Sequence, residues 1–562
     1  MVSDASASLR PWWGWRALGR PGVWLQKRWL WTLFLGFALI YLMLIPPGII
    51  VIDGISQFSV ADSLGRGLHL FVPCAASGYD ALPHLPSNEA SVIGRGGHCY
   101  SLWYPLISFA AAPFAGLGEG LGHLTGQRGQ NVAQVLVLIV PALATAGAAT
   151  LTASLSVKLG ASRRGAVAAA VAFGFGTEAL TYSRSFFAEP LAALLVALGV
   201  WGLTESGRRR YWGYLGLALA VLAKPQLILV GPALGALLIL QRRRAQGSGA
   251  EPFFRSLRPF WGPALATACG FAAYLLYNWA RFADPLRFGG VPRAFVAHNF
   301  ISPAAIGRAL GIYLVSPGKG LIWYSPVAAL AIVALWRRRR DPLAALCILA
   351  SLAILIFYIG QYDPYGGDEW GDRYLLPALP LLCAALGTLR PHLAKWAAVL
   401  VVIGVASQVP TTVGFYDRTY AEHRDQGVNL PDHRWSVARS PLVTSWPAMV
   451  HQIRDAADTD VRRLGHLAGA TGPRTSVRDT QLLHVVALWW WLLPILGIPW
   501  WVGALFAAGV IAAGARLLFR SAQPRAGPPY AGPEPAARTV DGGGLAASEL
   551  LTAAVAGPKE VP

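Results

Sequence analysis

The chain has 562 residues, of which 54% are hydrophobic and only 13% charged, and its formal net charge is +19. Soluble globular proteins contain roughly 25% charged residues, so the composition excludes an ordinary soluble protein. Repeated apolar runs long enough to span a bilayer indicate an all-α polytopic membrane protein, because a transmembrane barrel would need short alternating strands. The positive charge lies in short clusters between these runs, at 208–210, 242–244 and 337–340. This pattern is typical of cytoplasmic loops and not of a nucleic-acid-binding surface.

The N-terminal part of the chain predicts a membrane anchor. Residues 1–28 are basic and lead into an apolar run from Trp29 to Ile52. A run of this length predicts an uncleaved signal anchor with a cytoplasmic N-terminus. The region 53–130 is then the first extracytoplasmic loop. Within this loop, the segment WYPLISFAAAPFAGLG is either a further span or a helix lying in the membrane interface.

Alternation of the later apolar runs with the basic clusters predicts about 13 transmembrane helices in all. The run 212–240 is interrupted by AKPQ and is predicted to form a hairpin of two short spans, with Lys224 near its outer turn. The charge pattern leaves the C-terminus outside, despite Arg516 and Arg520.

The same alternation divides the chain into regions. A transmembrane core at 29–413 is followed by an extracytoplasmic loop at 414–480 and by two C-terminal helices within 481–520. The tail, 521–562, is rich in Pro, Gly and Ala, which predicts disorder.

Ionisable residues gather at the outer ends of the predicted spans. The stretch QYDPYGGDEWGDRYLLP, which begins at Gln361, places four acids and Arg373 between two apolar runs. The other ionisable residues at these ends are Asp53, Glu189, Lys224, Arg281 and Lys319. Such groups are expensive at membrane depth and are usually functional, although any single one can be a solvated loop charge.

The residue types at these outer ends suggest a class of chemistry. No Ser-His-Asp, HExxH or Walker pattern is present, and the 11 His residues show no metal-ligand spacing. Carboxylates serve as general bases, Arg and Lys bind phosphate, and aromatic rings stack on sugars. This set suits glycosyl transfer from a polyprenyl-phosphate sugar. A transporter or flippase, or a non-catalytic envelope-assembly protein, is the alternative, although transporters place polar groups at mid-membrane and repeat their halves.

Seven motifs over about residues 29–390 carry a resemblance to a known family. In chain order they are VIDGISQF, GHCYSLWYPLISFAAAPF, TYSRSFFAEPLAALLVALGVWGL, GYLGLALAVLAKPQLILVGP, YNWARFADPLRFGG, LVSPGKGLIWYSP and YGGDEWGDRYLLPALPLL. Their order resembles the bacterial branch of the GT-C membrane glycosyltransferases, the group of RgtA/B/C/D-like and protein O-mannosyltransferase- or ArnT-like enzymes. The resemblance implies the GT-C fold, a polyprenyl-phosphate monosaccharide as donor, and inversion at the anomeric carbon. It also implies a bacterial cytoplasmic-membrane enzyme whose active site faces outside and whose acceptor is an envelope polysaccharide, glycolipid or protein.

The family's catalytic base lies in the first outer loop and maps to Asp53. A partly desolvated carboxylate at a helix end can take the proton of an acceptor hydroxyl. Asp53 can instead act as the N-cap of the helical segment that follows it, where Asp is favoured. Relatives often carry an acidic pair here, whereas Gly54 replaces the second acid in this chain.

Three cations are candidates for binding the donor phosphate. Arg373 precedes a span, as an Arg does in relatives, and can stabilise the growing charge of the leaving phosphate; alternatively it pairs with Asp372 or Glu369. Lys224 before a proline and Lys319 between glycines are further candidates, and each can instead snorkel to the membrane interface.

The remaining polar groups are candidates for binding the acceptor or the sugar. They are Asp368, Glu369, Asp372, Tyr100 and Glu189. Glu189 can instead be an acid at a helix start, and Tyr100 part of an interfacial aromatic belt. No cofactor is expected, although a divalent cation at Asp363, Asp368, Glu369 and Asp372 is an alternative.

Two of the five cysteines, Cys74 and Cys99, lie in the first outer loop. An oxidising compartment would allow a disulfide between them that braces the loop presenting Asp53.

Overall fold

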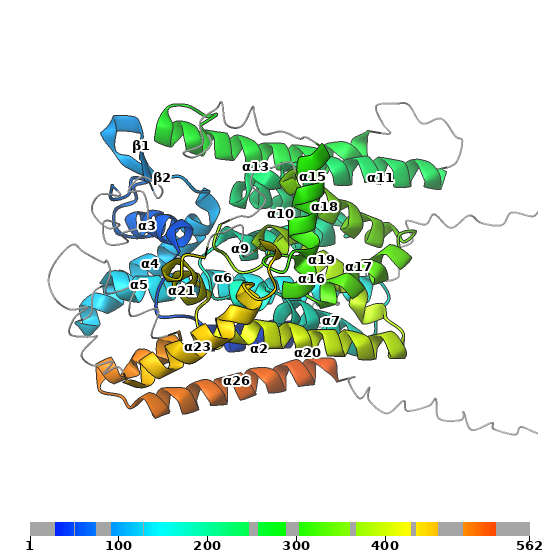
Figure 1. Ribbon diagram of the computed structural model, residues 1–562. Helices are drawn as coiled ribbons and strands as arrows, with labels where there is room; N and C mark the ends of the chain where they lie inside the picture. Colours follow the sequence, from blue (N-terminus) through cyan, green and yellow to red (C-terminus); the bar gives the residue numbers. More distant parts are fainter. Residues whose placement is uncertain are drawn as a thin grey trace, which may run out of the picture. The chain divides into compact units, whose positions relative to one another are not determined.

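The computed structural model describes residues 28–49, 51–74, 91–126, 129–246, 257–287, 303–359, 367–428, 434–458 and 487–523. Within these ranges the chain is almost entirely helical, and its strands form one antiparallel hairpin of β1 (Ser91–Ile93) and β2 (Cys99–Ser101) (Figure 1). The all-α fold predicted from the composition is therefore confirmed. The predicted N-terminal segment 1–28 and tail 521–562 fall almost wholly outside the described residues.

The helices pack around a continuous apolar core built largely from Ala, Leu, Val and aromatic side chains. In chain order the principal helices are α2 (Arg28–Met43), α3 (Ile52–Gly67), α4 (Pro105–Thr125), α5 (Gly129–Val137), α6 (Ile139–Lys158), α7 (Arg163–Gly176), α8 (Ala179–Tyr182), α9 (Ala188–Leu203), α10 (Arg210–Ala223), α11 (Val230–Gln246), α13 (Arg258–Phe282), α15 (Pro303–Val315), α16 (Leu321–Tyr324), α17 (Val327–Arg337), α18 (Pro342–Ile359), α19 (Leu379–Cys383), α20 (Pro391–Val413), α21 (Tyr416–Asp425), α23 (Pro441–Asp458) and α26 (Trp500–Ala522). The 3₁₀ helices are η3 (Arg95–Gly97), η4 (Gly207–Arg209), η5 (Pro225–Leu229), η6 (Arg373–Ala378), η7 (Ala384–Thr388) and η8 (Trp489–Leu496).

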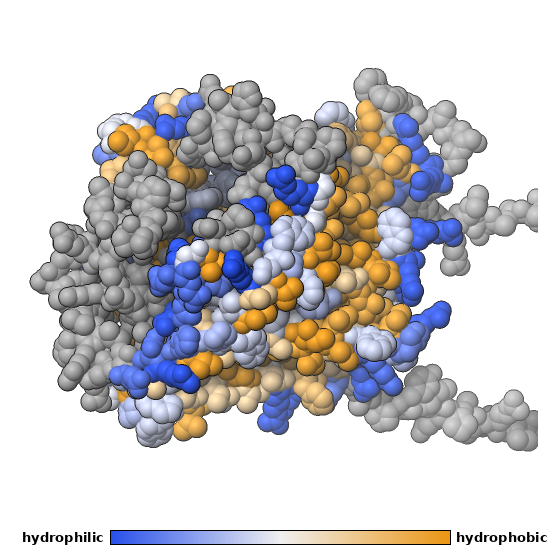
Figure 2. Space-filling view, in the orientation of Figure 1, coloured by the Kyte–Doolittle hydropathy of each residue, from blue (hydrophilic) through white to orange (hydrophobic). Residues whose placement is uncertain are grey.

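Six described segments are long and apolar enough to cross a membrane, and five shorter apolar helices accompany them. The six are 129–158, 225–244, 258–282, 342–359, 391–413 and 500–522. Large apolar side chains on several of them are exposed, including Leu265 on α13, Val402 on α20 and Leu505 on α26. Figure 2 shows a broad apolar area on one face, with hydrophilic side chains on either side of it. A multi-pass membrane protein accounts for this exposed apolar surface; the count of about thirteen spans stays a prediction.

The first span is shorter than the sequence predicts. The helix α2 ends at Met43 instead of continuing to Ile52. Pro46 and Pro47 follow this end, and because proline has no N–H and clashes with the preceding turn, the helix cannot extend through them. Asp53 therefore lies in the first turn of a separate helix, α3, whose N-cap is Val51.

The run 212–240 is interrupted at Lys224, as predicted; that its two halves form a hairpin of two spans stays a prediction. Between α10 and η5, Lys224 adopts an extended conformation with φ −146° and ψ 102°. Pro225 occupies the first position of η5, where its missing N–H costs nothing.

The segment predicted as a span at 374–389 is a buried succession of short turns, η6, α19 and η7, in place of one regular helix. Pro377 and Pro380 lie within it, and each removes a backbone donor. Arg373 is the first residue of this succession.

Basic helix ends gather at one end of the bundle. Arg338, after α17, donates a hydrogen bond to the Leu159 carbonyl after α6, at 2.6 Å. At the start of α7, Arg163 Nε donates to the Ser521 carbonyl at the end of α26, at 2.5 Å. The end of α26 thus lies beside basic residues that the sequence places inside, so the prediction of a C-terminus on the outer side is wrong at Ser521. The alternation fails at the predicted span 481–497: its described part, 487–497, forms η8, and Trp489 N–H donates to the Ile45 carbonyl, just after the end of α2, at 3.0 Å.

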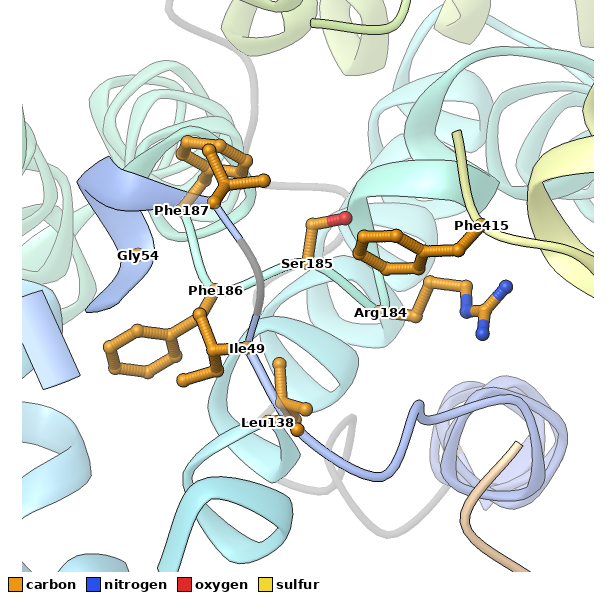
Figure 3. A pocket seen from close by; sticks show the side chains of 10 residues that line it. Ile49, Gly54, Leu138, Arg184, Ser185, Phe186, Phe187 and Phe415 are labelled. Atoms are coloured by element: carbon orange, nitrogen blue, oxygen red, sulfur yellow. The ribbon is translucent and has the colours of Figure 1, made fainter. Parts of the chain in front are cut away.

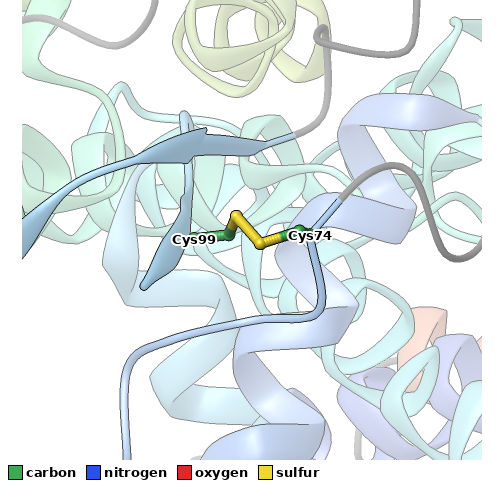
Figure 4. Close-up of a disulfide and its surroundings, with 2 residues drawn as sticks. All are labelled: Cys74 and Cys99. Atoms are coloured by element: carbon green, nitrogen blue, oxygen red, sulfur yellow. A yellow bond between two sulfur atoms is a disulfide. The ribbon is translucent and has the colours of Figure 1, made fainter. Parts of the chain in front are cut away.

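The β-hairpin is tied to the end of α3. Cys74 and Cys99 form the disulfide expected from the sequence, with their Cα atoms 5.2 Å apart (Figure 4). Val72 N–H also donates to the Cys99 carbonyl at 2.8 Å. The segment after α3 and strand β2 are therefore held together by both a covalent and a backbone contact.

Replacing Cys74 and Cys99 together by Ser is expected to destabilise the protein by about 2–4 kcal/mol, because the open chain gains conformational freedom when unfolded. The measurement is the thermal unfolding midpoint in detergent, with Cys269→Ser as the single-thiol control. An unchanged midpoint for the double variant would show that the bond does not stabilise the fold.

Candidate functional site

Four of the residues singled out in the sequence meet in one pocket. Arg373 Nη2 lies 2.9 Å from Asp53 Oδ2, and Arg373 Nε lies 3.6 Å from Glu189 Oε1. On its other side, Glu189 Oε1 lies 2.7 Å from Lys224 Nζ. Residues up to 320 positions apart in the sequence therefore form one continuous chain of alternating charges.

Each of these side chains is presented by the end of an element. Asp53 and Glu189 lie in the first turns of α3 and α9, where the positive end of the helix dipole favours a carboxylate. Lys224 lies at the break between α10 and η5, and Arg373 begins η6. Glu189, Lys224 and Arg373 are buried, and such burial of charge requires close pairing.

Aromatic rings surround the two cations. Lys224 Nζ lies 4.7 Å from the centre of the Tyr374 ring and 5.6 Å from that of Tyr358. The guanidinium carbon of Arg373 lies 4.6 Å from the centre of the Phe187 ring. These are cation–π distances, which add to the attraction from the carboxylates.

The pocket is partly open: about 360 Å³ of space lies within it and at its mouth, bordered by charged, amide and aromatic side chains. It is lined by Asp53, Gln57, Trp103, Tyr104, Phe187, Ala188, Glu189, Lys224, Gln226, Arg373 and Tyr374. Sequence reasoning missed Gln57 and Gln226 as site residues. Their positions carried a signal, because Gln57 is one helical turn after Asp53 and Gln226 is two residues after Lys224.

The alternative role of Asp53 as an N-cap is not observed, since Val51 occupies that position and Asp53 faces Arg373. Burial raises the pKa of the Asp53 carboxyl, although the Arg373 guanidinium beside it acts in the opposite direction. There is no room for a second acid next to it. A Cβ at Gly54 would lie 2.8 Å from Ile49 Cγ2 and 3.0 Å from the Phe186 carbonyl oxygen, closer than side chains pack.

Glu369 lies behind Arg373 and not in the pocket wall. Its Oε1 is 3.7 Å from Arg373 Nη1, and its Oε2 accepts a hydrogen bond from Tyr416 Oη at 2.7 Å. Burial raises the pKa of Glu369 to about 8. The helix α21, in the predicted loop 414–480, thus contributes a hydroxyl to the support of Arg373.

Lys319 holds the acidic stretch in place. Its ammonium donates hydrogen bonds to the carbonyls of Gly367, at 2.8 Å, and Glu369, and it does not line the pocket. Burial lowers the pKa of Lys319 to about 8. Lys319 therefore supports the acidic stretch from outside the pocket, and its phosphate-binding role stays a prediction.

Three further candidates lie away from the pocket or beyond what is described. Asp368 pairs with Arg424 at 3.0 Å on a partly exposed surface. Tyr100 Oη donates to the Arg95 carbonyl at 3.2 Å, on the β-hairpin. Asp363 lies outside the described residues. Among the residues that are described, no group of three or more His, Cys, Asp or Glu side chains could hold a metal ion. The divalent-cation alternative stays a prediction.

Asp372 faces a carboxylate that the sequence reading missed. Glu178, in the turn between α7 and α8, is fully buried, and no ion pair to either Glu178 or Asp372 is present within the described ranges. Gly371 lets its own backbone approach the Glu178 side chain: its φ is +60°, and a Cβ there would lie 2.4 Å from Glu178 Oε2. Burial, and then the Glu178 carboxylate, raise the pKa of Asp372.

A second, partly open pocket borders Gly54 and shares Phe187 with the first; it holds about 230 Å³ of space including its mouth and is lined mainly by apolar side chains (Figure 3). Its charged residue is Arg184, whose guanidinium points away from the other labelled side chains. That guanidinium donates to the carbonyls of Thr412, at 2.7 Å, and Gly414, at 3.0 Å. Arg184 is thus held by backbone carbonyls, and the Ser185 hydroxyl in the same pocket donates to the Thr181 carbonyl at 3.1 Å.

The fold and the pocket define a multi-pass helical membrane protein with a buried, charge-balanced pocket at the ends of its helices. No family model matches the sequence, and no curated protein matches it. Among solved structures, the chain is similar to crystal structures of ArnT from Cupriavidus metallidurans, one bound to undecaprenyl phosphate and one in the apo state. The identity is 14% and the TM-score 0.42 in both cases, over 90% and 89% of this chain and 78% of the ArnT chain. At this low identity and TM-score, the likeness establishes neither the fold nor the activity.

Replacing Glu178 by Gln is expected to raise the free energy of unfolding at alkaline pH by about 1–3 kcal/mol. This is the usual cost of a poorly compensated buried polar group, here the Glu178 carboxylate that the substitution removes. The pKa of Asp372 is raised in the folded protein. The contribution of its protonated form is therefore present below the ordinary carboxyl pKa and is lost as the pH rises through the folded value. Without the Glu178 carboxylate beside Asp372, the protein should lose less stability as the pH rises.

The measurement for Glu178→Gln is the unfolding midpoint between pH 6 and pH 9, with the exposed Asp425→Asn as control. A midpoint that rises equally at every pH, or that falls, would contradict the assignment of an electrostatic conflict between Glu178 and Asp372.

Proposed function

We propose that the protein is an inverting glycosyltransferase of the GT-C type. It moves a monosaccharide from a polyprenyl-phosphate donor to a hydroxyl of an envelope polysaccharide, glycolipid or protein. The observation that carries this proposal is the direct contact between Asp53 and Arg373, at 2.9 Å, in a pocket that also holds Glu189 and Lys224. A carboxylate beside a phosphate-binding cation is what transfer from a sugar phosphate requires.

The sidedness of the pocket supports a reaction outside the cytoplasm. Glu189 begins α9, whereas Lys158 and Glu205 form an ion pair of 2.6 Å just beyond its other end. The 16 residues of α9 span about 24 Å at 1.5 Å each. The pocket and the basic clusters thus lie at opposite ends of this helix, and basic loops favour the cytoplasmic side.

Arg373 and Lys224 are the groups we assign to the donor phosphate. Arg373 offers a planar fork of N–H donors that matches phosphate oxygens, and Lys224 adds a compact charge on the other side of Glu189. A phosphate that binds Arg373 competes with Asp53 for the same guanidinium. Donor binding therefore frees the Asp53 carboxylate to accept a hydrogen bond from the acceptor hydroxyl.

The transfer itself conserves charge in the pocket. The acceptor oxygen bonds to C1 of the sugar, its proton passes to Asp53, and the C1–O bond breaks with its electron pair on the phosphate oxygen. The phosphodiester, with one negative charge, becomes a phosphomonoester with two, while Asp53 becomes neutral. Extra charge is costly in a buried site. With the base next to the phosphate-binding cation, Asp53 loses its charge as the phosphate gains one, so the total charge beside Arg373 does not change.

Replacing Asp53 by Asn is expected to lower turnover by about 10²–10⁴-fold, the usual value of general base assistance. Donor binding should persist, since Arg373 and Lys224 remain. The measurement is release of radiolabelled sugar from a panel of polyprenyl-phosphate sugars by the purified protein in nanodiscs. Asp62→Asn, on the same helix but paired with Arg66 at 3.0 Å, is the matched control. Turnover by Asp53→Asn at the wild-type rate would remove Asp53 as the base, and no turnover by the wild type with any donor would favour a transporter or a scaffold.

The pH dependence of kcat/KM is expected to report the environment of Asp53. Activity requires the deprotonated carboxylate, so it falls as the pH falls through the Asp53 pKa. Because burial raises that pKa, the acid limb should lie above the ordinary carboxyl value of about 4. A limb at the ordinary value, or one that persists unchanged in the residual activity of Asp53→Asn, would assign the acid limb to another group.

A further inference from the structure

We infer that Gln57, Gln226 and Trp103 form a subsite for the sugar of the donor, and that this sugar is uncharged. The inference rests on the proposed glycosyltransferase function and names the class of its substrate. All three residues line the pocket that holds Asp53 and Arg373. They come from three separate parts of the chain: α3, η5 and the connection between β2 and α4.

Three polar atoms in this part of the pocket are buried and lack a hydrogen-bond partner among the described residues. They are Gln57 Oε1, Gln226 Oε1 and Trp103 Nε1. Buried polar groups are normally satisfied, and leaving one unpaired costs about 1–3 kcal/mol. Two acceptors and one donor on residues that line one pocket are the complement of a ring carrying several hydroxyls, since each hydroxyl both donates and accepts.

The positions of these side chains are fixed by contacts with the surrounding structure. Gln226 Nε2 donates to Tyr104 Oη, which holds the amide and leaves its Oε1 without a partner among the described residues. The Trp103 carbonyl accepts from Arg281 Nη1 at 3.4 Å. That guanidinium is buried and lies 3.9 Å from the centre of the Tyr277 ring. Arg281, an ionisable residue singled out in the sequence, thus acts as a positioning residue for Trp103.

The hairpin and α3 are fixed to each other as well. The Ser56 and Ser101 hydroxyls share a hydrogen bond of 2.7 Å, and the Ser108 hydroxyl donates to the Gln57 carbonyl at 2.8 Å. A site whose polar groups are held in place loses little entropy when it binds its ligand.

The location of the subsite assigns it to the donor sugar. Gln57 follows Asp53 by one turn of α3, and Gln226 follows Lys224 by two residues. The donor sugar is bonded directly to the phosphate, so it must lie next to the cations that bind the phosphate. The sugar C1 must also lie within reach of the acceptor oxygen that Asp53 deprotonates.

The charge of the pocket indicates that this sugar is neutral. The two cations, Lys224 and Arg373, are already paired with Asp53 and Glu189, and the three unpartnered atoms belong to neutral amide and indole groups. An ammonium or carboxylate facing these three groups would find no counter-charge among them, which is costly in a buried site. The aromatic rings of Trp103 and Tyr104 suit the apolar face of an uncharged ring.

The test is direct binding of defined lipids to the purified full-length protein in nanodiscs. The probes are polyprenyl phosphate without sugar and polyprenyl phosphates carrying glucose, mannose or galactose, glucosamine, or glucuronate. Gln57→Leu and Gln226→Leu should each weaken binding of a lipid with a neutral sugar by about 3- to 10-fold, the value of one hydrogen bond. Binding of the sugar-free lipid should not change. That unchanged binding also shows that each variant is folded.

The matched control is Gln241→Leu, because Gln241 Nε2 donates to the Pro342 carbonyl far from the pocket; it should leave both affinities unchanged. Equal weakening of the sugar-bearing and sugar-free lipids by the two pocket variants would overturn the subsite. Preference of the wild type for glucosamine or glucuronate would overturn the neutral-sugar assignment. If the wild type binds the sugar-free lipid and a neutral sugar adds nothing to its affinity, the inference fails while the phosphate site stands. Failure to bind every probe, including the sugar-free lipid, would instead overturn the proposed function.

Discussion

The guanidinium of Arg373 is shared among three carboxylates, and the rest of the pocket depends on this sharing. Its three nitrogens face Asp53 at 2.9 Å, Glu189 at 3.6 Å and Glu369 at 3.7 Å. Arg has five donors in a rigid fork, so one side chain can hold groups from three different elements. A lysine at this position would bring a point charge without that geometry. The position of Asp53 relative to Glu189 and Lys224 is consequently fixed through Arg373.

Backbone breaks place these charges where they meet. Pro46 and Pro47 end α2, so that α3 starts as a new helix and presents Asp53 in its first turn. Pro225 ends α10 and leaves Lys224 in an extended link between two helices. Regular helices through the same segments would have pointed these side chains in directions set by the helical period. The interruptions free single residues to face a common point, and Glu189 and Lys224 are each followed directly by a proline.

Much of the fold class and part of the site could be predicted from the sequence. Apolar runs and basic clusters identify a helical membrane protein because bilayer thickness sets the length of a span. The four charged residues of the pocket could be found because ionisable groups are rare near membrane-spanning segments, so each one stands out in the sequence. Gln57 and Gln226 do not stand out, since neutral amides are common on exposed surfaces. Only the three-dimensional contacts show that their oxygens are buried and unpartnered.

The errors of the sequence reading have a physical origin as well. Hydropathy measures the length of an apolar run but not its backbone conformation, so the predicted span at 374–389 hides a series of 3₁₀ and α turns around Pro377 and Pro380. The predicted side of the C-terminus has another cause: the described part of the predicted span 481–497 folds as η8 beside the end of α2. Glu178 was overlooked because it lies within an apolar region and only folding brings it against Asp372.

The location of the pocket at the ends of the helices agrees with the chemistry of a lipid-linked donor. A polyprenyl chain stays in the hydrocarbon, and its phosphate lies at the edge of the membrane, where cations from the protein can reach it. A pocket at mid-membrane would have to bury the phosphate fully, and one in solution would have to extract the chain. Lys224 and Arg373 are buried from water yet lie at the ends of apolar helices. At that depth, ion pairs are screened little by salt and remain strong, while the lipid tail need not leave the bilayer. The balanced charges of Asp53, Glu189, Lys224 and Arg373 are what allow a pocket at this depth to remain folded before the donor enters.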